Sequence, residues 1–306
     1  MAVTTIPFRR PTGRRKGRGR QQLSGWIFAL PFLVVFGIFM LFPLVASFLM
    51  SFTDFTSADS ENPLSVGFVG IDQYVSLFGN AQFLRSLLNT AYFVLVGIPL
   101  TMVVGVALAV AINSGITRFR TAFRVGFYVP VVTSIVAVSV VWRFILQDDG
   151  LLNTGLSLIG IDGPNWLHDP NWSMPAMVIV ATWRNAGNIM IITLAGLQNI
   201  PNEVLEAGMV DGASPWQRFS GIVLPMLRPT LLLGAILLSV GYLQFFDEPF
   251  VMTQGGPLGS TLSATYFTYN QFGFGKYAFA SAASYVIFLA IALLTLFQSR
   301  VLRAKD

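Results

Sequence analysis

The sequence predicts an all-α membrane protein with six transmembrane helices. Of its 306 residues, 54% are hydrophobic and only 11% are charged, whereas a soluble domain carries about 25% charged residues. Six apolar stretches recur along the chain, and each approaches the roughly 20 residues that a helix needs to cross a bilayer. Most of the charged residues fall between these stretches. Together these observations exclude a soluble globular domain.

The first three predicted spans lie in the N-terminal half. The first covers residues 25–50, the second lies within 86–117 with its apolar centre at 91–112, and the third covers 125–142. The apolar region of a cleaved signal peptide runs roughly 7–15 residues. Because the first stretch is longer, we interpret it as an uncleaved span.

The last three predicted spans contain more polar residues. The fourth covers residues 174–197 and is interrupted by Arg184, the fifth runs from about residue 230 into Asp247 and Glu248, and the sixth covers 277–299. Glycine, proline and small residues occur within most of the spans. Small residues let helix backbones approach closely, so the spans are expected to pack as one bundle.

Loop charges predict the orientation of the chain. The loops 51–82 and 147–173 each contain four acids and no Lys or Arg, whereas the loop 118–124 contains Arg118, Arg120 and Arg124 and no acid. Cytoplasmic loops of membrane proteins carry an excess of Lys and Arg. The alternation therefore predicts that both termini are cytosolic.

The predicted organisation has three parts. Residues 1–23 form a basic cytosolic tail, residues 24–300 the transmembrane domain, and residues 301–306 a short cytosolic tail. Seven of the 19 cations lie in the first 20 positions. Because this run abuts an apolar span, it is interpreted as an orienting tail rather than a nucleic-acid site. With no Cys and one His, the chain predicts no metal site and no cofactor.

The loop 198–229 is predicted to form two short helices. Asn202 is expected to cap the first, and Gly212 to end it in a left-handed conformation. Ser214 is expected to cap the second, with Gln217 placed for a capping box. A loop of this length with its own helices is usually functional.

This loop also has the character of a docking element. Met209 and Val210 form an apolar knob, and Glu206 and Asp211 flank it with acidic groups. An apolar surface with an acidic rim predicts contact with a cytosolic protein partner.

The same loop resembles the EAA signature of ATP-binding-cassette (ABC) importer permeases. Three residues separate Gly208 from Gly212, and nine separate Gly212 from Ile222, as in that signature. The matching residues are Glu206-Ala207-Gly208, Gly212, Ile222, Leu224 and Pro225. The third position is Gly208 where the signature has Ala. Segments 195–201, 211–219 and 253–257 are similar to the maltose-type, sugar-importing branch.

The resemblance, which covers roughly residues 20–300, implies a type I importer permease with a MetI-like bundle in the inner membrane of a prokaryotic cell. It implies a heterodimer with a second related permease, two cytosolic ATPase subunits and an extracytoplasmic solute-binding lipoprotein. The loop would be the coupling helix that seats in the ATPase. The residues expected to make that contact are Glu206, Ala207, Gly208, Asp211 and Gly212. Because the sequence has no G-x-x-x-x-G-K-[ST] loop, ATP hydrolysis is expected on partner chains and not on this one.

Polar residues inside the spans mark a candidate substrate pathway. Asn188 lies one helical turn after Arg184, so the two share a helix face. In the fifth span, Gln244 lines up with Asp247 and Glu248 by the same spacing. The resemblance to the maltose-type branch implies that these segments line a sugar cavity. The predicted substrate-pathway residues are Arg184, Asn185, Asn188, Tyr242, Gln244 and Asp247. A structural ion pair between Arg184 and Asp247 or Glu248 is the alternative.

Two alternatives to sugar import stay open. A permease of the same superfamily could carry another solute, such as a glycerol phosphate ester, and Arg184 would suit an anionic one. A secondary transporter usually shows an internal repeat, which this sequence lacks.

Overall fold

The computed structural model describes residues 18–62, 66–114 and 119–302. The predictions made for residues 1–17, Arg118 and residues 303–306 lie outside the described residues. Within the described ranges the chain is helical and contains only one isolated β-bridge, between Thr53 and Phe68. The all-α prediction is confirmed. The chain divides into two units, Met1–Leu49 and Met50–Asp306, and each is described by itself.

The first unit contains the first predicted span. Helix α1 (Arg18–Phe36) continues through the π-helical turn η2 (Gly37–Leu41) into α2 (Phe42–Met50), whose last residue opens the second unit. The stretch Phe28–Met50 is long and apolar enough to cross a membrane. The candidate span of the structure therefore begins three residues after the first predicted span, residues 25–50, and ends at the same residue.

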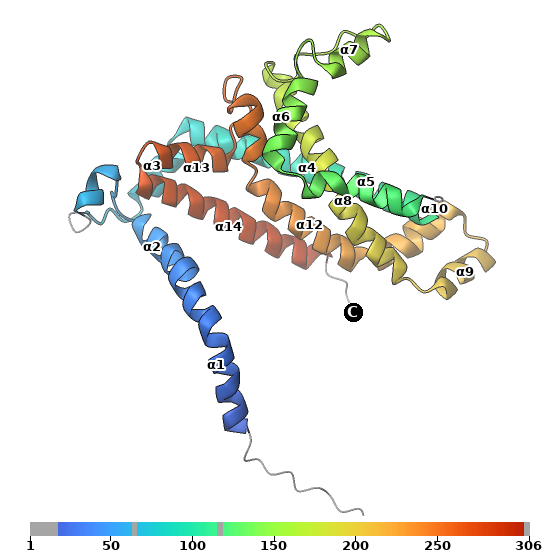
Figure 1. Ribbon diagram of the computed structural model, residues 1–306, viewed down its shortest axis with the longest axis horizontal. Coiled ribbons are helices and arrows are strands. Elements are labelled where there is room, and N and C mark those ends of the chain that lie inside the picture. The colour runs from blue at the N-terminus through green and yellow to red at the C-terminus, as the bar shows by residue number, and fades with distance from the viewer. Residues whose placement is uncertain (1–17, 63–65, 115–118, 303–306) are drawn as a thin grey trace, which may run out of the picture. The chain divides into compact units, whose positions relative to one another are not determined.

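Four helices form the centre of the second unit. Helix α4 (Ala81–Ser114) packs along α8 (Pro170–Gln198), and α12 (Arg228–Leu243) packs against α4 and α14 (Tyr277–Leu302) (Figure 1). At Gly105 an added Cβ would lie 2.6 Å from Cβ of Ile189. Only glycine permits this close crossing of α4 and α8. The largest buried side chains of the core include Phe93 and Met177.

The third predicted span is not a single straight helix. Helix α5 (Arg120–Val132) and helix α6 (Ile135–Ile145) meet at an angle of 100°. Thr133 between them has an extended backbone conformation, and Ser134 is not helical. Pro130, which cannot donate a helical hydrogen bond, lies in the last turn of α5 and favours a helix end there. The span predicted at 125–142 therefore includes a sharp turn.

The fifth predicted span is shorter than expected. Helix α12 ends at Leu243, residues 245–246 are not helical, and the π-helical turn η6 (Pro249–Thr253) follows. The prediction that helical spacing aligns Gln244 with Asp247 and Glu248 is wrong, because the helix does not continue through these residues. Pro249 explains the break, because its ring would clash with the carbonyl of Phe245 four residues earlier in a continuous helix.

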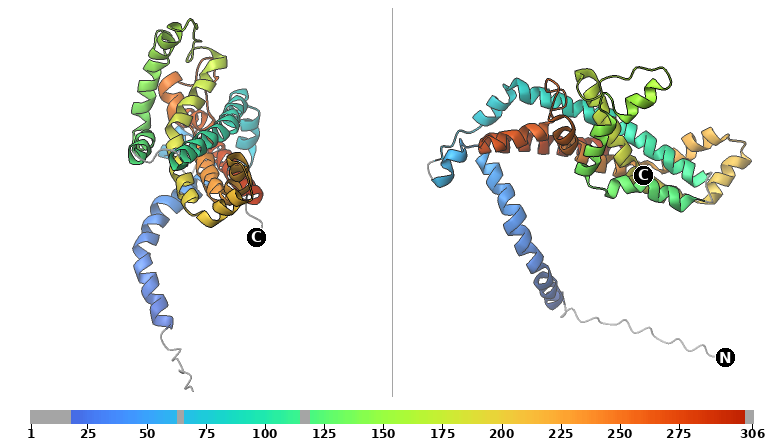
Figure 2. Two further views of the ribbon diagram at one scale, coloured as in Figure 1. Left: turned by 90° about the vertical axis from the view of Figure 1, so that its right-hand side faces the viewer. Right: turned by 45° about the horizontal axis from the view of Figure 1, so that its top comes forward.

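The connecting segments gather at two ends of the second unit. One end carries η3 (Ser57–Glu61), α3 (Asp72–Phe78) and α13 (Ala264–Gly273), and Ser57 N–H donates to Gly275 O over 2.8 Å. The opposite end carries α9 (Asn202–Val210), α10 (Pro215–Arg218), η5 (Phe219–Val223) and α11 (Leu224–Met226) (Figure 2). Helix α7 (Leu151–Ser157) follows α6.

Candidate functional site

The six predicted substrate-pathway residues line one cavity of about 280 Å³ in the second unit. Helix α8 contributes Arg184, Asn185 and Asn188. Tyr242 and Gln244 come from the end of α12, and Asp247 from the segment after the helix break. Two segments that lie more than 50 residues apart in the sequence therefore meet at one cavity.

The α8 wall presents amide and guanidinium groups. The side-chain amide of Asn185 donates to Ala181 O over 2.9 Å, within its own helix. Arg184 is half-buried, and its Nε has no hydrogen-bond partner among the described residues. Within the same residues no salt bridge joins Arg184 to Asp247 or Glu248. The described structure therefore does not contain the ion pair that was the alternative interpretation of Arg184.

Tyr242 forms a buried part of the cavity wall. Its side chain is 4% exposed, and its hydroxyl lies 2.7 Å from Oγ1 of Thr101, which in turn lies 3.1 Å from Oγ1 of Thr182. The Phe93 ring lies 4.8 Å from the Tyr242 ring. Because hydroxyl and ring both have protein partners, Tyr242 joins α4, α8 and α12 beside the cavity.

Eight further residues of the described chain line the cavity but were not among the predicted pathway residues, and four of them shape its wall most clearly. Phe93 stacks on Phe245 with ring centroids 3.9 Å apart and an interplanar angle of 8°, and Ile135 begins α6. Glu248, considered only as an ion-pair partner, is buried. Phe93 and Ile135 lie in apolar runs of other spans, where nothing in the sequence distinguishes them from lipid-facing residues.

The 198–229 segment has the two short helices that the sequence predicts. Gly212 has a φ of +76°, and the N–H groups of Gly212 and Ala213 donate to Met209 O and Gly208 O, both over 3.0 Å. This is a Schellman motif, which a left-handed glycine typically forms at a helix end. The conformation predicted for Gly212 is confirmed.

The two predicted helix starts have different outcomes. Ser214 and Gln217 form the predicted capping box, with Ser214 N–H donating to Gln217 Oε1 over 2.8 Å. The predicted Asn202 cap is wrong. Asn202 is already the first helical residue of α9, and Pro201, in an extended conformation, occupies the cap position without a side-chain hydrogen bond.

Gly208 is the buried residue of α9, and it lies where α9 packs on Arg218 and Ile222. A Cβ at Gly208 would lie 2.9 Å from Cδ1 of Ile222 and 3.4 Å from Cγ of Arg218. The two short helices thus pack through this position. The rest of α9 is open, because Glu206, Ala207 and Asp211 are exposed.

Helix α8 connects the cavity with the 198–229 segment. It is continuous from Pro170 to Gln198, so the ten residues from Asn188 to its end span about 15 Å at 1.5 Å per residue. Only Asn199–Pro201 separate it from α9.

Long apolar helices around a polar cavity, with short helices at one end, define a multi-pass membrane permease. The model of the family described as binding-protein-dependent transport system inner membrane component matches residues 12–304, and the chain belongs to this family. The family of ABC importer permeases predicted from the EAA-like motif is confirmed. The chain is an inner-membrane component with a MetI-like fold.

Relatives match over nearly the whole chain. The lactose transport system permease protein of Rhizobium radiobacter is 34% identical over 300 residues, which cover 96% of this chain and 99% of that protein. The trehalose/maltose transport system permease protein of Thermococcus litoralis is 30% identical over 287 residues, covering 94% and 96%. A chain in the crystal structure of a bacterial ABC transporter involved in alginate import shares the fold, with a TM-score of 0.77, 24% identity and coverage of 95% and 99%.

Proposed function

We propose that this chain forms the translocation pathway for a sugar or oligosaccharide, with the cavity between α8 and α12 as its substrate site. The observation that carries the proposal is that all six predicted pathway residues line that one cavity. Sugar sites need amide and carboxylate groups that hydrogen-bond hydroxyls, together with apolar ring faces. Arg184, Asn185, Asn188, Gln244 and Asp247 supply the polar groups, and Phe93 and Phe245 supply rings.

The printed names of the relatives support a carbohydrate. They are permeases for lactose, for trehalose and maltose, and for arabinooligosaccharides. The solute would reach the cavity from an extracytoplasmic solute-binding lipoprotein. A second related permease would complete the pathway as the other half of a heterodimer.

We also propose that the 198–229 segment couples this pathway to two cytosolic ATPase subunits, which hydrolyse the ATP. Glu206, Ala207 and Asp211 are exposed on or beside α9, as is Val210 at 87%. Gly208 and Gly212 set the position and the end of the helix. A rigid α8 would carry movement of α9 to Asn188 and Arg184.

This proposal places the 198–229 segment and both termini in the cytosol. The acidic loops 51–82 and 147–173 would face outward. Single cysteines in this cysteine-free chain, labelled with a membrane-impermeant thiol reagent in intact cells, test the orientation. A cysteine at Asp211 should react only after the membrane is opened, and labelling from outside would contradict the proposal.

Charge reversal at Glu206 tests the coupling role. Glu206→Lys should abolish uptake of radiolabelled lactose, maltose or trehalose, whichever the wild-type complex carries, and should reduce recovery of the ATPase with the permease. The matched control is Glu203→Lys, because Glu203 is another exposed acid on α9. Normal membrane levels with full ATPase recovery and uptake in Glu206→Lys would refute the coupling assignment.

A further inference from the structure

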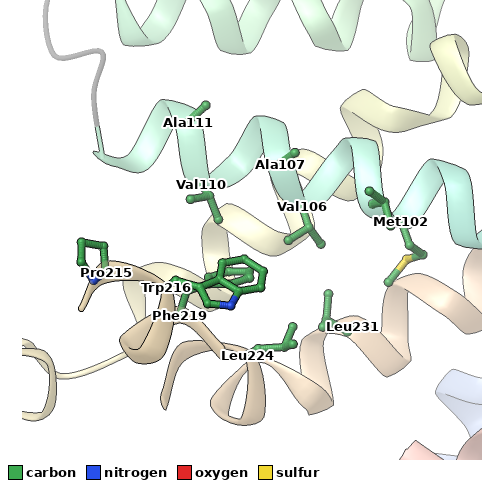
Figure 3. A pocket seen from close by; sticks show the side chains of 11 residues that line it. Met102, Val106, Ala107, Val110, Ala111, Pro215, Trp216, Phe219, Leu224 and Leu231 are labelled. Atoms are coloured by element: carbon green, nitrogen blue, oxygen red, sulfur yellow. The ribbon is translucent and has the colours of Figure 1, made fainter. Parts of the chain in front are cut away.

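A large apolar groove lies between α4 and the connection from α10 to α12 (Figure 3). Its volume is about 930 Å³, and no charged side chain of the described residues lines it. Val106 and Val110 of α4 face Phe219 and Leu231 across it, and the Trp216 indole lies in the groove near Phe219. Trp216 is 72% exposed, so the groove is open beside a large aromatic ring.

The groove has the depth of one bilayer leaflet. Along α4 it extends from Met102 to Ala111, and nine residues of helix cover about 14 Å. Half of a bilayer's hydrocarbon core is about 15 Å thick. The groove thus has about the length of one acyl chain in a leaflet.

The surface end of the groove is positively charged. A second cavity of about 300 Å³ adjoins it and shares Val110, Pro215 and Phe219 with it. Arg218 lines this second cavity, and among the described residues its Nε is buried without a hydrogen-bond partner. In the described part of the chain, no carboxylate lines either cavity.

We propose that the groove binds an acyl chain of an anionic phospholipid, with the lipid phosphate held by Arg218. A guanidinium group binds phosphate oxygens through charge-assisted hydrogen bonds, and basic pockets beside membrane helices on the cytoplasmic side bind anionic headgroups. Tryptophan is enriched at the level of the headgroups, and the exposed Trp216 lines the groove. An apolar helix of a neighbouring protein would fill the groove but would leave Arg218 without an acceptor.

The bound lipid also supports the position of α9. The aliphatic stem of Arg218 lies against Gly208, since a Cβ at Gly208 would be 3.4 Å from Arg218 Cγ. A headgroup that fixes the guanidinium therefore fixes the side chain on which α9 packs. Lipid occupancy and the placement of α9 become linked through one residue.

Quenching of Trp216 fluorescence by brominated lipids tests the proposal. The full-length permease, purified with the subunits that accompany it, is reconstituted into phosphatidylcholine vesicles that contain phosphatidylglycerol brominated in its acyl chains. The emission lost in Trp216→Phe isolates Trp216 from the other five tryptophans. We expect half-maximal quenching at about fivefold less brominated phosphatidylglycerol than equally brominated phosphatidylcholine, the factor that one arginine at a membrane surface supplies.

Three arginine variants complete the test. Arg218→Gln should remove the preference for phosphatidylglycerol, and Arg218→Lys should keep most of it because the charge remains. Arg228→Gln, at an exposed position that lines neither cavity, should leave it unchanged. Equal quenching by both lipids in the wild type would overturn the headgroup assignment. Absence of quenching by either lipid would show that protein covers the groove and would overturn the proposal as a whole.

Discussion

The cavity and the 198–229 segment differ in the distance along the chain over which their contacts form. In the 198–229 segment, the helix end at Gly212, the capping box at Ser214 and the packing of Gly208 on Ile222 all join residues fewer than 20 positions apart. The cavity depends on contacts between α4, α8 and α12, such as the hydrogen bond between Thr101 and Tyr242, which lie 141 residues apart.

This difference separates two ways in which the protein can fail. The short-range contacts hold α9 as a small unit, so damage there should disturb its partner contact while the bundle stays folded. The cavity shares its side chains with the helix packing, so a change at Tyr242 alters stability as well as the wall of the pathway. Substitutions in the two regions should therefore give distinct combinations of folding and transport defects.

After the loss of uptake expected for Glu206→Lys, the largest effect is expected at Gly212. Gly212→Val forces a branched side chain into a φ of +76°, which costs roughly 1–2 kcal/mol for an ordinary residue and more for a branched one. Uptake and ATPase recovery should both fall about tenfold, since 1.4 kcal/mol is a factor of ten in an equilibrium constant. Membrane levels measured by immunoblot should stay normal.

Gly221→Val is the control for this variant. Gly221 has no positive φ, and no atom lies within 4 Å of a Cβ built there. It should retain most of the uptake. If both glycine variants fail equally, the left-handed conformation at Gly212 is not the cause.

The next effect separates the two asparagines of the cavity. Asn188→Ala removes a side-chain amide that lines the cavity and is therefore placed to bond the substrate. Loss of a substrate hydrogen bond of about 1 kcal/mol should raise the KM of uptake about fivefold. Asn185→Ala should have a smaller effect, because the Asn185 amide already donates to Ala181 O. Uptake kinetics with the transported sugar measure both. A larger defect in Asn185→Ala would reverse this assignment of the α8 face.

A smaller effect is expected at Tyr242. Tyr242→Phe removes the hydroxyl that bonds Thr101, so the purified complex should lose about 1 kcal/mol of stability and melt a few degrees lower in detergent. A double-mutant cycle with Thr101→Val isolates the pair. Additive effects of the two substitutions would show that this bond contributes nothing to joining α4 and α12.

The smallest effect lies outside both regions, at Asp59. The hydroxyl and backbone N–H of Thr56 donate to Asp59 over 2.8 and 2.9 Å, and these bonds hold the pKa of that carboxyl below its usual range. The stability that this cap adds is present above the ordinary Asp pKa and is lost as pH falls through the lowered value. The protection factors of the amides of residues 57–61 in hydrogen exchange should fall on acidification, and Asp59→Asn should remove that dependence.

The sequence predicts some elements better than others for physical reasons. The left-handed Gly212 and the Ser214–Gln217 box depend on bonds to near neighbours, so the local sequence contains their signal. The assignment of Arg184 and Tyr242 to one cavity depended on the family resemblance. A polar residue in a span indicates function, but it does not indicate which helices meet there. Phe93 could not be found, since its partner Phe245 is reached only through the fold.

The bends were missed although their causes are visible. Pro130 precedes the turn between α5 and α6, and Pro249 follows the break after α12. Hydropathy measures how apolar a run is, whereas the direction of the helix depends on where a backbone hydrogen bond is missing. Asn202 was misplaced for a similar reason, because Pro201 already occupied the position that begins α9.

The contact between Gly208 and Ile222 has a consequence for exchanging parts between related permeases. An alanine at position 208 would bring its Cβ to 2.9 Å from the outermost carbon of Ile222, a clash that rotation of the isoleucine tip can relieve. Valine at position 222 lacks that carbon and would remove the conflict. An exchange of residue 208 for alanine therefore requires only that the tip of Ile222 rotate, so a chimera can take residue 208 from another permease and keep Ile222.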